Sequence, residues 1–291
     1  MRIAFQGERG AYSEAAAIAF FGQDIETVPC ETFDDVFACV VSGECERGMA
    51  PIENSLAGSI HHNYDLLARN DLRIIGEYVL RVEHCLIAHP ETRLEDVRVV
   101  VSHPQALAQC DQFIRSHHWK REAAYDTSGS VKLIKEQQRY DAAAIASQRA
   151  AQVYEMKILA RNIEDDPQNF TRFLALSREG VQSSSQNGEN LRPNAATKTS
   201  IVFALRNMPG ALFKALSVFA LRDIDLTKIE SRPIAGKPWE YLFYLDFAGS
   251  ASEERGQRAL QHLEEIATYL RVFGSYPRAE IGTDTGGSEG A

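Results

Sequence analysis

The stretch 169–173, with the sequence NFTRF, contains the residues whose types most directly suggest chemistry. Burying an arginine such as Arg172 within an apolar run is costly unless its charge is paired. No acid lies beside it in the run, so its partner is either an anionic ligand or an acid from elsewhere in the chain. Strand packing of a β-branched residue explains Thr171 on its own. In a regular strand Thr171 and Arg172 point to opposite faces, so both can serve one site only at a strand end or an irregular turn.

Two further junctions between a predicted strand and a loop carry polar groups that could bind an anion. In 7–13 (GERGAYS), two glycines precede a helix for which we expect Ser13 to be the N-cap. The exposed backbone N–H groups there could bind a carboxylate, although a tight turn explains them equally simply. In 51–58 (PIENSLAG), Asn54 and Ser55 follow a strand and could donate to substrate oxygens. Helix capping is the alternative role for them.

Helix capping alone accounts for the polar residues of two more junctions. Ser102 and Gln105 predict a capping box, with Pro104 in the first turn of the helix. His103 could titrate near neutrality, but a position in a surface loop explains it as well. Residues 126–130 (DTSGS) are small and polar at a predicted helix start. Together the junctions predict a polar site suited to a small anion, without naming a reaction.

The elements that carry these residues predict an α/β fold in residues 1–179. Apolar strands are expected at 2–6, 98–101, 142–146 and 170–176, and helices at 13–21 and after Thr32. Thr32 and Asp35 have the spacing of a capping box. Repeated strand–helix units favour largely parallel sheets, in which ligands bind beyond the carboxyl ends of the strands.

The composition changes at residues 180–197, which are rich in Ser, Asn, Gln and Gly and predict a linker. Residues 198–277 then follow the order βαββαβ, which predicts a ferredoxin-like domain. Strands are expected at 199–205, 226–231, 241–247 and 271–275, and helices at 211–222 and 252–270. Residues 278–291 predict a flexible tail.

The overall composition argues against several classes of partner and site. The chain of 291 residues has a net charge of −9, which disfavours nucleic acid and anionic membranes. No stretch approaches the roughly 18 apolar residues of a membrane span. The N-terminus lacks the apolar run of a signal peptide, so we expect a cytoplasmic protein. Five cysteines without a CxxC pair predict reduced thiols rather than a metal or disulfide framework: Cys30, Cys39, Cys45, Cys85 and Cys110.

Taken together, five stretches resemble the prephenate dehydratase family and occur in that family's order. They are GERGAYSEAA, PIENSLAGSI, SHPQALAQC, YDTSGSVKLI and NFTRF. Residues 198–277 resemble an ACT domain, with 209–212 (PGAL) and 230–233 (ESRP) matching its phenylalanine-binding motifs. Two departures from the family pattern are Glu8-Arg9, where the family often has proline, and Gly129-Ser130 in a variable position.

The resemblance implies a catalytic domain of two α/β lobes, similar to periplasmic binding proteins, and a homodimer or homotetramer. It implies conversion of prephenate to phenylpyruvate, or of arogenate to phenylalanine, with no cofactor and no metal. Because the first strand begins at residue 2, no fused chorismate mutase is expected. An exported solute-binding protein and a free-standing amino-acid sensor are the competing interpretations.

The resemblance also assigns roles to residues. Thr171 is the expected catalytic donor to the leaving hydroxyl, and Arg172 the expected holder of the side-chain carboxylate. The full substrate-binding set is Arg172, Phe173, Tyr12, Ser13, Asn54, Ser55, Gly58, Gln105, Thr127 and Asn169. The expected phenylalanine site comprises Asn207, Pro209, Gly210, Ala211, Leu212, Glu230, Ser231, Arg232 and Pro233.

Overall fold

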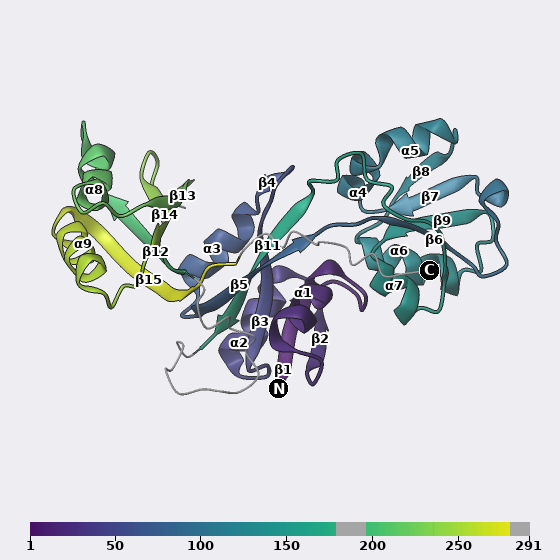
Figure 1. Cartoon of the computed structure of the whole chain (residues 1–291), viewed down its shortest axis with the longest axis horizontal. Coiled ribbons are helices and arrows are strands. Elements are labelled where there is room, and N and C mark those ends of the chain that lie inside the picture. The colour runs from purple at the N-terminus through teal and green to yellow at the C-terminus, as the bar shows by residue number, and fades with distance from the viewer. Residues whose placement is uncertain (179–195, 235, 280–291) are drawn as a thin grey trace, which may run out of the picture.

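The computed structural model describes residues 1–178, 196–234 and 236–279. Figure 1 shows three bodies in a row, with two lobes formed by the N-terminal part of the chain and the C-terminal domain beside the first lobe. The predicted linker falls almost entirely outside the described residues, as does most of the predicted tail.

The first lobe is built on a mixed sheet in the order β2-β1-β3-β11-β5, with β4 paired to β3. β1 is parallel to β2 and β3, whereas β11 runs antiparallel between β3 and β5. Its elements are β1 (Arg2–Gln6), α1 (Tyr12–Phe21), β2 (Glu26–Cys30), α2 (Phe33–Ser42), β3 (Arg47–Asn54), β4 (Gly58–Ser59), α3 (His61–Arg69), β5 (Arg73–Arg81) and β11 (Phe170–Ser177).

The second lobe has its own sheet in the order β10-β6-β9-β7-β8. The chain enters this lobe between β5 and β6 and returns between β10 and β11. The elements are β6 (Cys85–Ala88), a 3-10 turn (Leu94–Asp96), β7 (Val99–Ser102), α4 (Pro104–Gln109), α5 (Asp111–Ser116), β8 (Lys120–Ala123), α6 (Thr127–Glu136), β9 (Ala142–Ala146), α7 (Gln148–Val153) and β10 (Lys157–Ala160). The predicted pair of α/β lobes is therefore confirmed.

The C-terminal domain is an antiparallel sheet in the order β13-β14-β12-β15 with two helices, which confirms the ferredoxin-like prediction. Its elements are β12 (Thr197–Leu205), α8 (Ala211–Ala220), β13 (Leu226–Pro233), β14 (Tyr241–Ala248), α9 (Glu254–Ile266) and β15 (Ala267–Pro277). One face of the sheet buries Phe203 and Phe247 against the helices. The opposite face packs Tyr244, Phe273 and Tyr276 into the core of the first lobe.

Several local predictions differ from the structure. The Thr32–Asp35 capping box is confirmed, but α1 begins at Tyr12 after Ala11, and Ser13 does not cap it. Ser102 donates its hydroxyl to the buried Ile145 carbonyl, and His103 caps α4 by accepting from the Gln105 N–H. The helix predicted over 252–270 ends at Ile266, because the following residues pair with β12.

Candidate active site

The end of β3 and the start of β11 bring Asn54, Asn169 and Thr171 together. Asn54 and Thr171 are register partners in the two strands. The Asn54 Nδ2 group donates to Thr171 Oγ1 at 3.0 Å and to Asn169 Oδ1 at 2.8 Å. All three residues are buried, with exposed fractions of 5%, 9% and 0% for Asn54, Thr171 and Asn169. The structure therefore assembles a tight polar cluster from three of the residues predicted to form the site.

The hydrogen bonds of this cluster define which groups donate. Asn54 Oδ1 accepts from the backbone N–H groups of Leu56 and Ala57, at 3.1 and 2.9 Å, so its Nδ2 must face Thr171. Because Thr171 Oγ1 accepts a hydrogen bond from Asn54, the hydroxyl hydrogen of Thr171 is available for donation to a ligand. The Nδ2 group of Asn169 is buried and has no hydrogen-bond partner among the described residues. The cluster thus presents two donors, a hydroxyl and an amide.

The cluster lies where the two connections between the lobes meet. The Val82 N–H donates to the Asn169 carbonyl at 2.7 Å, which joins one connection to the other. Ser55 Oγ donates to the Gln168 carbonyl at 2.8 Å and accepts from the Phe170 N–H at 2.9 Å. Ser55 therefore fastens its loop to β11. Gly58 pairs with Asn54 from β4 and has a φ of +82°, a conformation suited to glycine.

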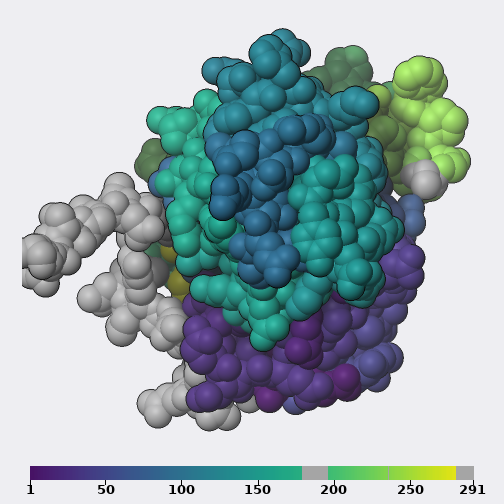
Figure 2. Space-filling model, turned by 90° about the vertical axis from the view of Figure 1, so that its right-hand side faces the viewer, coloured from purple at the N-terminus to yellow at the C-terminus, as the bar shows by residue number. Residues whose placement is uncertain are grey.

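The predicted anion-binding loop of residues 7–13 instead closes the first lobe on the second. Ser147 Oγ donates to the Gly10 carbonyl at 2.6 Å, and a Cβ on Gly10 would lie 2.6 Å from Ala150 Cα. The Gly10 N–H donates to Glu14 at 2.7 Å, so it is already occupied within the chain. Figure 2 shows the blue and teal surface of the second lobe resting on the purple N-terminal elements.

Tyr12 and Ser13 also lie where the two lobes meet. Among the described residues, neither side chain is hydrogen-bonded to Thr171. The Tyr12 hydroxyl donates to the Glu83 carbonyl at 2.8 Å and lies 2.9 Å from His84 Nδ1. His84 Nε2 in turn contacts Gln109 Oε1 at 3.0 Å. Burial lowers the pKa of His84, although Gln109 and Glu164 act in the opposite direction. Ser13 is buried in the first turn of α1.

Gln105 and Thr127 occupy helix starts in the second lobe. Gln105 is exposed in the first turn of α4, and Thr127 is half-buried as the first residue of α6. The cap of α6 is Asp126, which also accepts from the Glu8 N–H at 3.2 Å. Within the described part of the chain, no hydrogen bond links Gln105 or Thr127 to the Asn54–Thr171 pair.

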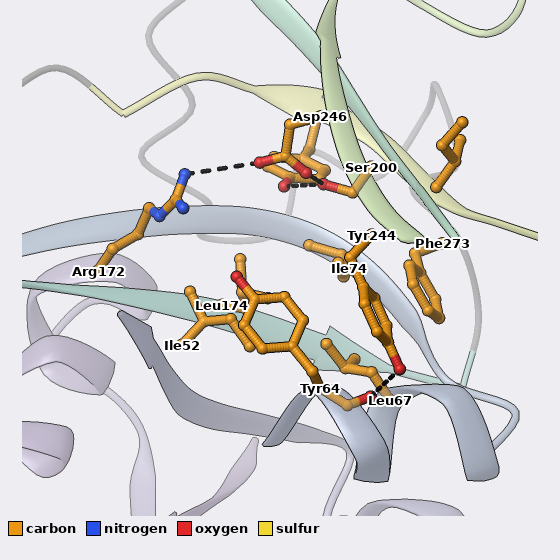
Figure 3. A pocket seen from close by; sticks show the side chains of 12 residues that line it. Ile52, Tyr64, Leu67, Ile74, Arg172, Leu174, Ser200, Tyr244, Asp246 and Phe273 are labelled. Atoms are coloured by element: carbon orange, nitrogen blue, oxygen red, sulfur yellow. Dashed lines mark hydrogen bonds and ion pairs between the residues drawn. The ribbon is translucent and has the colours of Figure 1, made fainter. Parts of the chain in front are cut away.

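The structure places the side chains of Arg172 and Phe173 away from the Asn54–Thr171 pair. Arg172 lies on the opposite face of β11 from Thr171, and its guanidinium pairs with Glu53, with Glu77 at 3.8 Å and with Asp246 at 3.5 Å. Figure 3 shows it directed at Asp246 of the C-terminal domain. An acid from elsewhere, the alternative that the sequence left open, is thus its partner. Phe173 is 1% exposed and packs in the core beside α1.

The charges around Arg172 set its protonation. Burial alone would lower the pKa of Arg172, but the carboxylates of Asp246, Glu77 and Glu53 raise it above its ordinary value. Burial would likewise raise the pKa of Glu53, but Arg172 and Lys228 lower it. Both groups are therefore held in their charged forms.

Sequence reasoning missed the partners of Arg172, although a signal for them existed. Asp246 stands within an apolar strand, YLFYLDFA. That is the same pattern that singled out Arg172, because a charge within an apolar run requires a partner. Glu53 precedes Asn54 in a stretch that carried the resemblance, but it was not assigned a role.

The two motifs expected to bind phenylalanine are only partly brought together. Asn207, Ala211 and Leu212 line a cavity of about 140 Å³ together with Trp239 and Tyr241. Pro209 and Gly210 form the turn before α8, and Gly210 is its N-cap with a φ of +78°. Within β13, Ser231 and Pro233 are exposed, whereas the other two residues of the motif face the first lobe: Glu230 accepts from Ser59 and Arg232 pairs with Asp65.

In residues 1–178, 196–234 and 236–279, no helix is long and apolar enough to cross a membrane. The same residues contain no group of three or more His, Cys, Asp or Glu side chains arranged to hold a metal ion.

Comparison with known proteins shows strong relationships along the whole chain. The family model for prephenate dehydratase matches residues 3–181, and the ACT domain model matches residues 199–265. Arogenate dehydratase/prephenate dehydratase 2 of Arabidopsis thaliana is 51% identical over 286 residues, covering 95% of this chain and 73% of the relative. Arogenate dehydratase 2 of Petunia hybrida is 48% identical over 291 residues, covering 95% and 72%.

Solved structures agree with these relationships. Prephenate dehydratase of Arthrobacter aurescens in complex with L-Phe has a TM-score of 0.85 and 32% identity, covering 96% of this chain and 90% of the other. A structure described as GqqA, a novel type of quorum quenching acylase, has a TM-score of 0.86 and 35% identity, covering 96% and 98%.

The comparisons correct one expectation and establish the family. The prediction of a cytoplasmic protein is wrong on this evidence, because Arabidopsis relatives at 51%, 46% and 45% identity are chloroplastic enzymes. The family match extends over most of the first two lobes, and the relatives span nearly all of the chain. The chain belongs to the prephenate dehydratase family.

Proposed function

We propose that the protein converts prephenate to phenylpyruvate, or arogenate to phenylalanine, in phenylalanine biosynthesis, and that phenylalanine inhibits it through the ACT domain. Residues 1–179 would carry catalysis and residues 198–277 regulation. The observation that carries the proposal is the Asn54–Thr171 pair, which leaves a buried hydroxyl free to donate at the junction of the lobes. The family match and the dehydratase relatives support the same reaction.

The reaction requires the protein to supply one proton. The bond between the ring and its carboxylate breaks, and its electron pair enters the ring as carbon dioxide leaves. The ring then expels its hydroxyl group, which takes up a proton and departs as water. Aromatisation drives these steps. Thr171 is placed to donate that proton or hydrogen bond and to regain a proton from solvent or a neighbour. A positioned donor of this kind typically contributes ~10²–10⁴ in rate.

Asn54 prepares Thr171 for this role. A threonine hydroxyl is a weak acid, but a hydrogen bond accepted by its oxygen polarises the O–H bond and strengthens it as a donor. The amide of Asn54 is itself held by the Leu56 and Ala57 N–H groups. This preorganisation aims the donor before the substrate arrives, which is the usual basis of electrostatic catalysis.

The charge of Arg172, the expected holder of the side-chain carboxylate, is paired within the chain, which favours other groups for substrate binding. Asn169 supports such a role because its Nδ2 is a buried donor without a partner among the described residues. We assign Tyr12, Ser13, Ser55, Gly58, Gln105 and Thr127 to the walls around the site, where the two lobes meet. Exposed apolar side chains of the ACT domain, Phe213 and Trp239 at 75% and 76%, support a homodimer or homotetramer.

The direct test is the rate of phenylpyruvate formation from prephenate, with arogenate assayed in parallel for phenylalanine. Each assay is run with and without millimolar-scale phenylalanine. Turnover that phenylalanine suppresses is the expected result. Turnover of neither substrate would contradict the proposal and favour a binding protein built on the same fold.

A further inference from the structure

Six charged side chains form a cluster between the first lobe and the ACT domain, called here the interdomain charge cluster. Its members are Glu53, Glu77 and Arg172 of the first lobe and Lys198, Lys228 and Asp246 of the ACT domain. Lys198 Nζ lies 2.6 Å from Glu77 and 2.8 Å from Asp246, and Lys228 Nζ lies 3.0 Å from Glu53.

The cluster is deeply buried. The Lys198 and Glu77 side chains are 2% exposed, and those of Asp246 and Arg172 are 13% and 18% exposed. Removing one member of such a group leaves an uncompensated charge in a site with little water, which is strongly unfavourable. The position of each charge therefore depends on the positions of the others across the interface.

Two members of the cluster are sequence neighbours of the active-site pair. Glu53 precedes Asn54 in β3, and Arg172 follows Thr171 in β11. The register pairs Asn54 with Thr171 and Glu53 with Arg172. The two strands thus carry the active-site pair on one face and an ion pair on the other. The register of β11 against β3 shifts between Arg172 and Phe173, so a ladder irregularity separates this end of β11 from the regular strand.

The ACT strands that supply the cluster also border the expected phenylalanine site. Tyr241 and Phe243 of β14 line the cavity beside Leu212, and Asp246 lies three residues further along the same strand. In β13, Lys228 and Glu230 face the first lobe, whereas Ser231 pairs with Phe243 in the register. A ligand at that cavity and the charge cluster therefore share two paired strands.

The interface contains a small cavity beside the interdomain charge cluster. Figure 3 shows Arg172 and Asp246 beside a small cavity that Tyr64, Tyr244 and Phe273 also line. Its volume of about 20 Å³ holds roughly one water molecule. The Nε atom of Arg172 is buried and lacks a hydrogen-bond partner among the described residues. Arg172 is therefore not held by a complete set of hydrogen bonds, whereas Asp246 is held by Lys198 at 2.8 Å and by Ser200 at 2.5 Å.

We infer that Arg172 is a positioning residue for Thr171, and that the interdomain charge cluster carries the effect of phenylalanine from the ACT domain to the Asn54–Thr171 pair of the same chain. This inference rests on the proposed function and goes beyond it by naming the residues that couple the two sites. Phenylalanine shifts the cluster because it binds differently to two arrangements of β13 and β14. Coupling of this kind is reciprocal, so a substrate analogue also alters phenylalanine affinity.

The first test compares the wild type with Asp246→Asn, which keeps the shape of the side chain and removes its charge. We expect calorimetry to show phenylalanine affinity within about threefold of wild type, while inhibition of turnover weakens by about tenfold or more, a typical range for coupling between sites. Asp71→Asn is the matched control, because it removes an exposed ion pair with Arg271 at the same interface but outside the cluster. That control should be inhibited like the wild type.

The second test separates positioning from substrate binding at Arg172. We expect Arg172→Gln to lower kcat about tenfold or more with little change in KM, and Arg172→Lys to recover part of the loss. A raised KM with unchanged kcat would make Arg172 a substrate ligand and overturn the assignment. Should these buried changes prevent folding, Glu53→Gln severs the cluster at its most exposed member, whose side chain is 36% exposed, and it too must weaken inhibition for the inference to stand.

Hydrogen exchange provides a readout that needs no turnover. Phenylalanine should change the exchange of residues 170–173 in the wild type and in Asp71→Asn, and leave it unchanged in Asp246→Asn. An equal response in all three proteins overturns the coupling. A wild type that turns over neither substrate disproves the proposed function, yet the exchange comparison still decides the coupling. A wild type that binds no phenylalanine disproves both the regulation and the coupling.

Discussion

Thr171 and Arg172 are consecutive residues of β11, yet their side chains serve opposite sides of the same sheet. Thr171 Oγ1 accepts a hydrogen bond from Asn54 at 3.0 Å, and Arg172 lies 3.5 Å from Asp246 of the ACT domain. One residue therefore belongs to the candidate active site and the other to the contact with the regulatory domain. One peptide bond connects the two, and the bond between Glu53 and Asn54 in β3 forms an equivalent connection.

Replacing Thr171 with Ala should lower kcat by ~10²–10⁴-fold with little change in KM, because the proton donor is lost while the binding groups remain. Thr171→Ser keeps the hydroxyl and should retain much of the activity. Steady-state kinetics with prephenate and arogenate measure both variants, and circular dichroism melting controls for folding. A raised KM at unchanged kcat would assign Thr171 to binding instead.

Asn54→Asp should reduce both activity and stability. The carboxylate still accepts from Leu56 and Ala57, but it no longer donates to Thr171 and Asn169. Leaving buried groups unsatisfied costs about 1–3 kcal/mol of stability. The value of kcat should fall by about tenfold or more, because the proton donor is no longer held in position. Asn63→Asp is the control, because it removes a buried Nδ2 donation to the Pro51 carbonyl in the same lobe and preserves the Asn54–Thr171 bond. A similar loss of kcat in both variants would argue against a special role for Asn54.

Glu14 should contribute stability that disappears in acid. Its side chain is 2% exposed and accepts from Arg149 and from the Gly10 N–H, both at 2.7 Å. Burial alone would raise the pKa of Glu14, but Arg149, Gly10 and Thr27 lower it below 4.5. The contribution is therefore complete above about pH 4.5 and is lost as pH falls through the lower folded-state pKa.

Urea denaturation between acidic and neutral pH tests this role of Glu14. Glu14→Gln should lose about 1.5–3 kcal/mol at neutral pH, the range for charge-assisted hydrogen bonds. The difference from wild type should shrink as the pH falls below 4.5. A difference that is independent of pH would show that packing, and not the charge, is responsible.

His84 should make the junction of the lobes sensitive to mild acid. Burial lowers its pKa below 6.5 in the folded state. The neutral form is therefore favoured on folding, and this stability is complete above about pH 6.5 and lost as pH falls toward the folded-state value. His84→Gln should flatten the pH dependence of the denaturation midpoint in that window. An unaltered pH profile in the variant would assign the dependence to other groups.

Gly210→Ala should weaken the response to phenylalanine. The φ of +78° is strained for alanine by about 1–2 kcal/mol, and no atom lies within 4 Å of the added Cβ, so the effect comes from the backbone. Gly43→Ala is the control, since Gly43 has the same left-handed conformation, with a φ of +83°, at the end of α2 in the first lobe, and its added Cβ would meet only the end of the Arg178 side chain. Calorimetry should show weaker phenylalanine binding only in Gly210→Ala. Equal weakening in both would mean a general loss of stability.

The sequence alone determined the fold class, the family and the order of elements in the C-terminal domain, because these follow from local periodicity and from short motifs that need no knowledge of the third dimension. In residues 1–179 it predicted only four of the eleven strands. The alternation of strands and helices predicted two α/β lobes, and βαββαβ predicted the C-terminal domain. The sequence also placed Asn54, Asn169 and Thr171 in one site. It was less reliable at helix caps: Ser102 matched a capping box, but a buried carbonyl across the sheet competes for its hydroxyl.

Only the tertiary structure decided what covers each face of β11. Strand alternation predicts that Thr171 and Arg172 point apart, but it does not say which surface lies above each side chain. The ACT sheet covers the Arg172 face and supplies Asp246, so an apparent substrate ligand becomes an interdomain contact. Likewise, Gly10 N–H looked free for a carboxylate until packing placed Glu14 against it. Partners distant in sequence follow from how the elements pack, and packing depends on the whole chain.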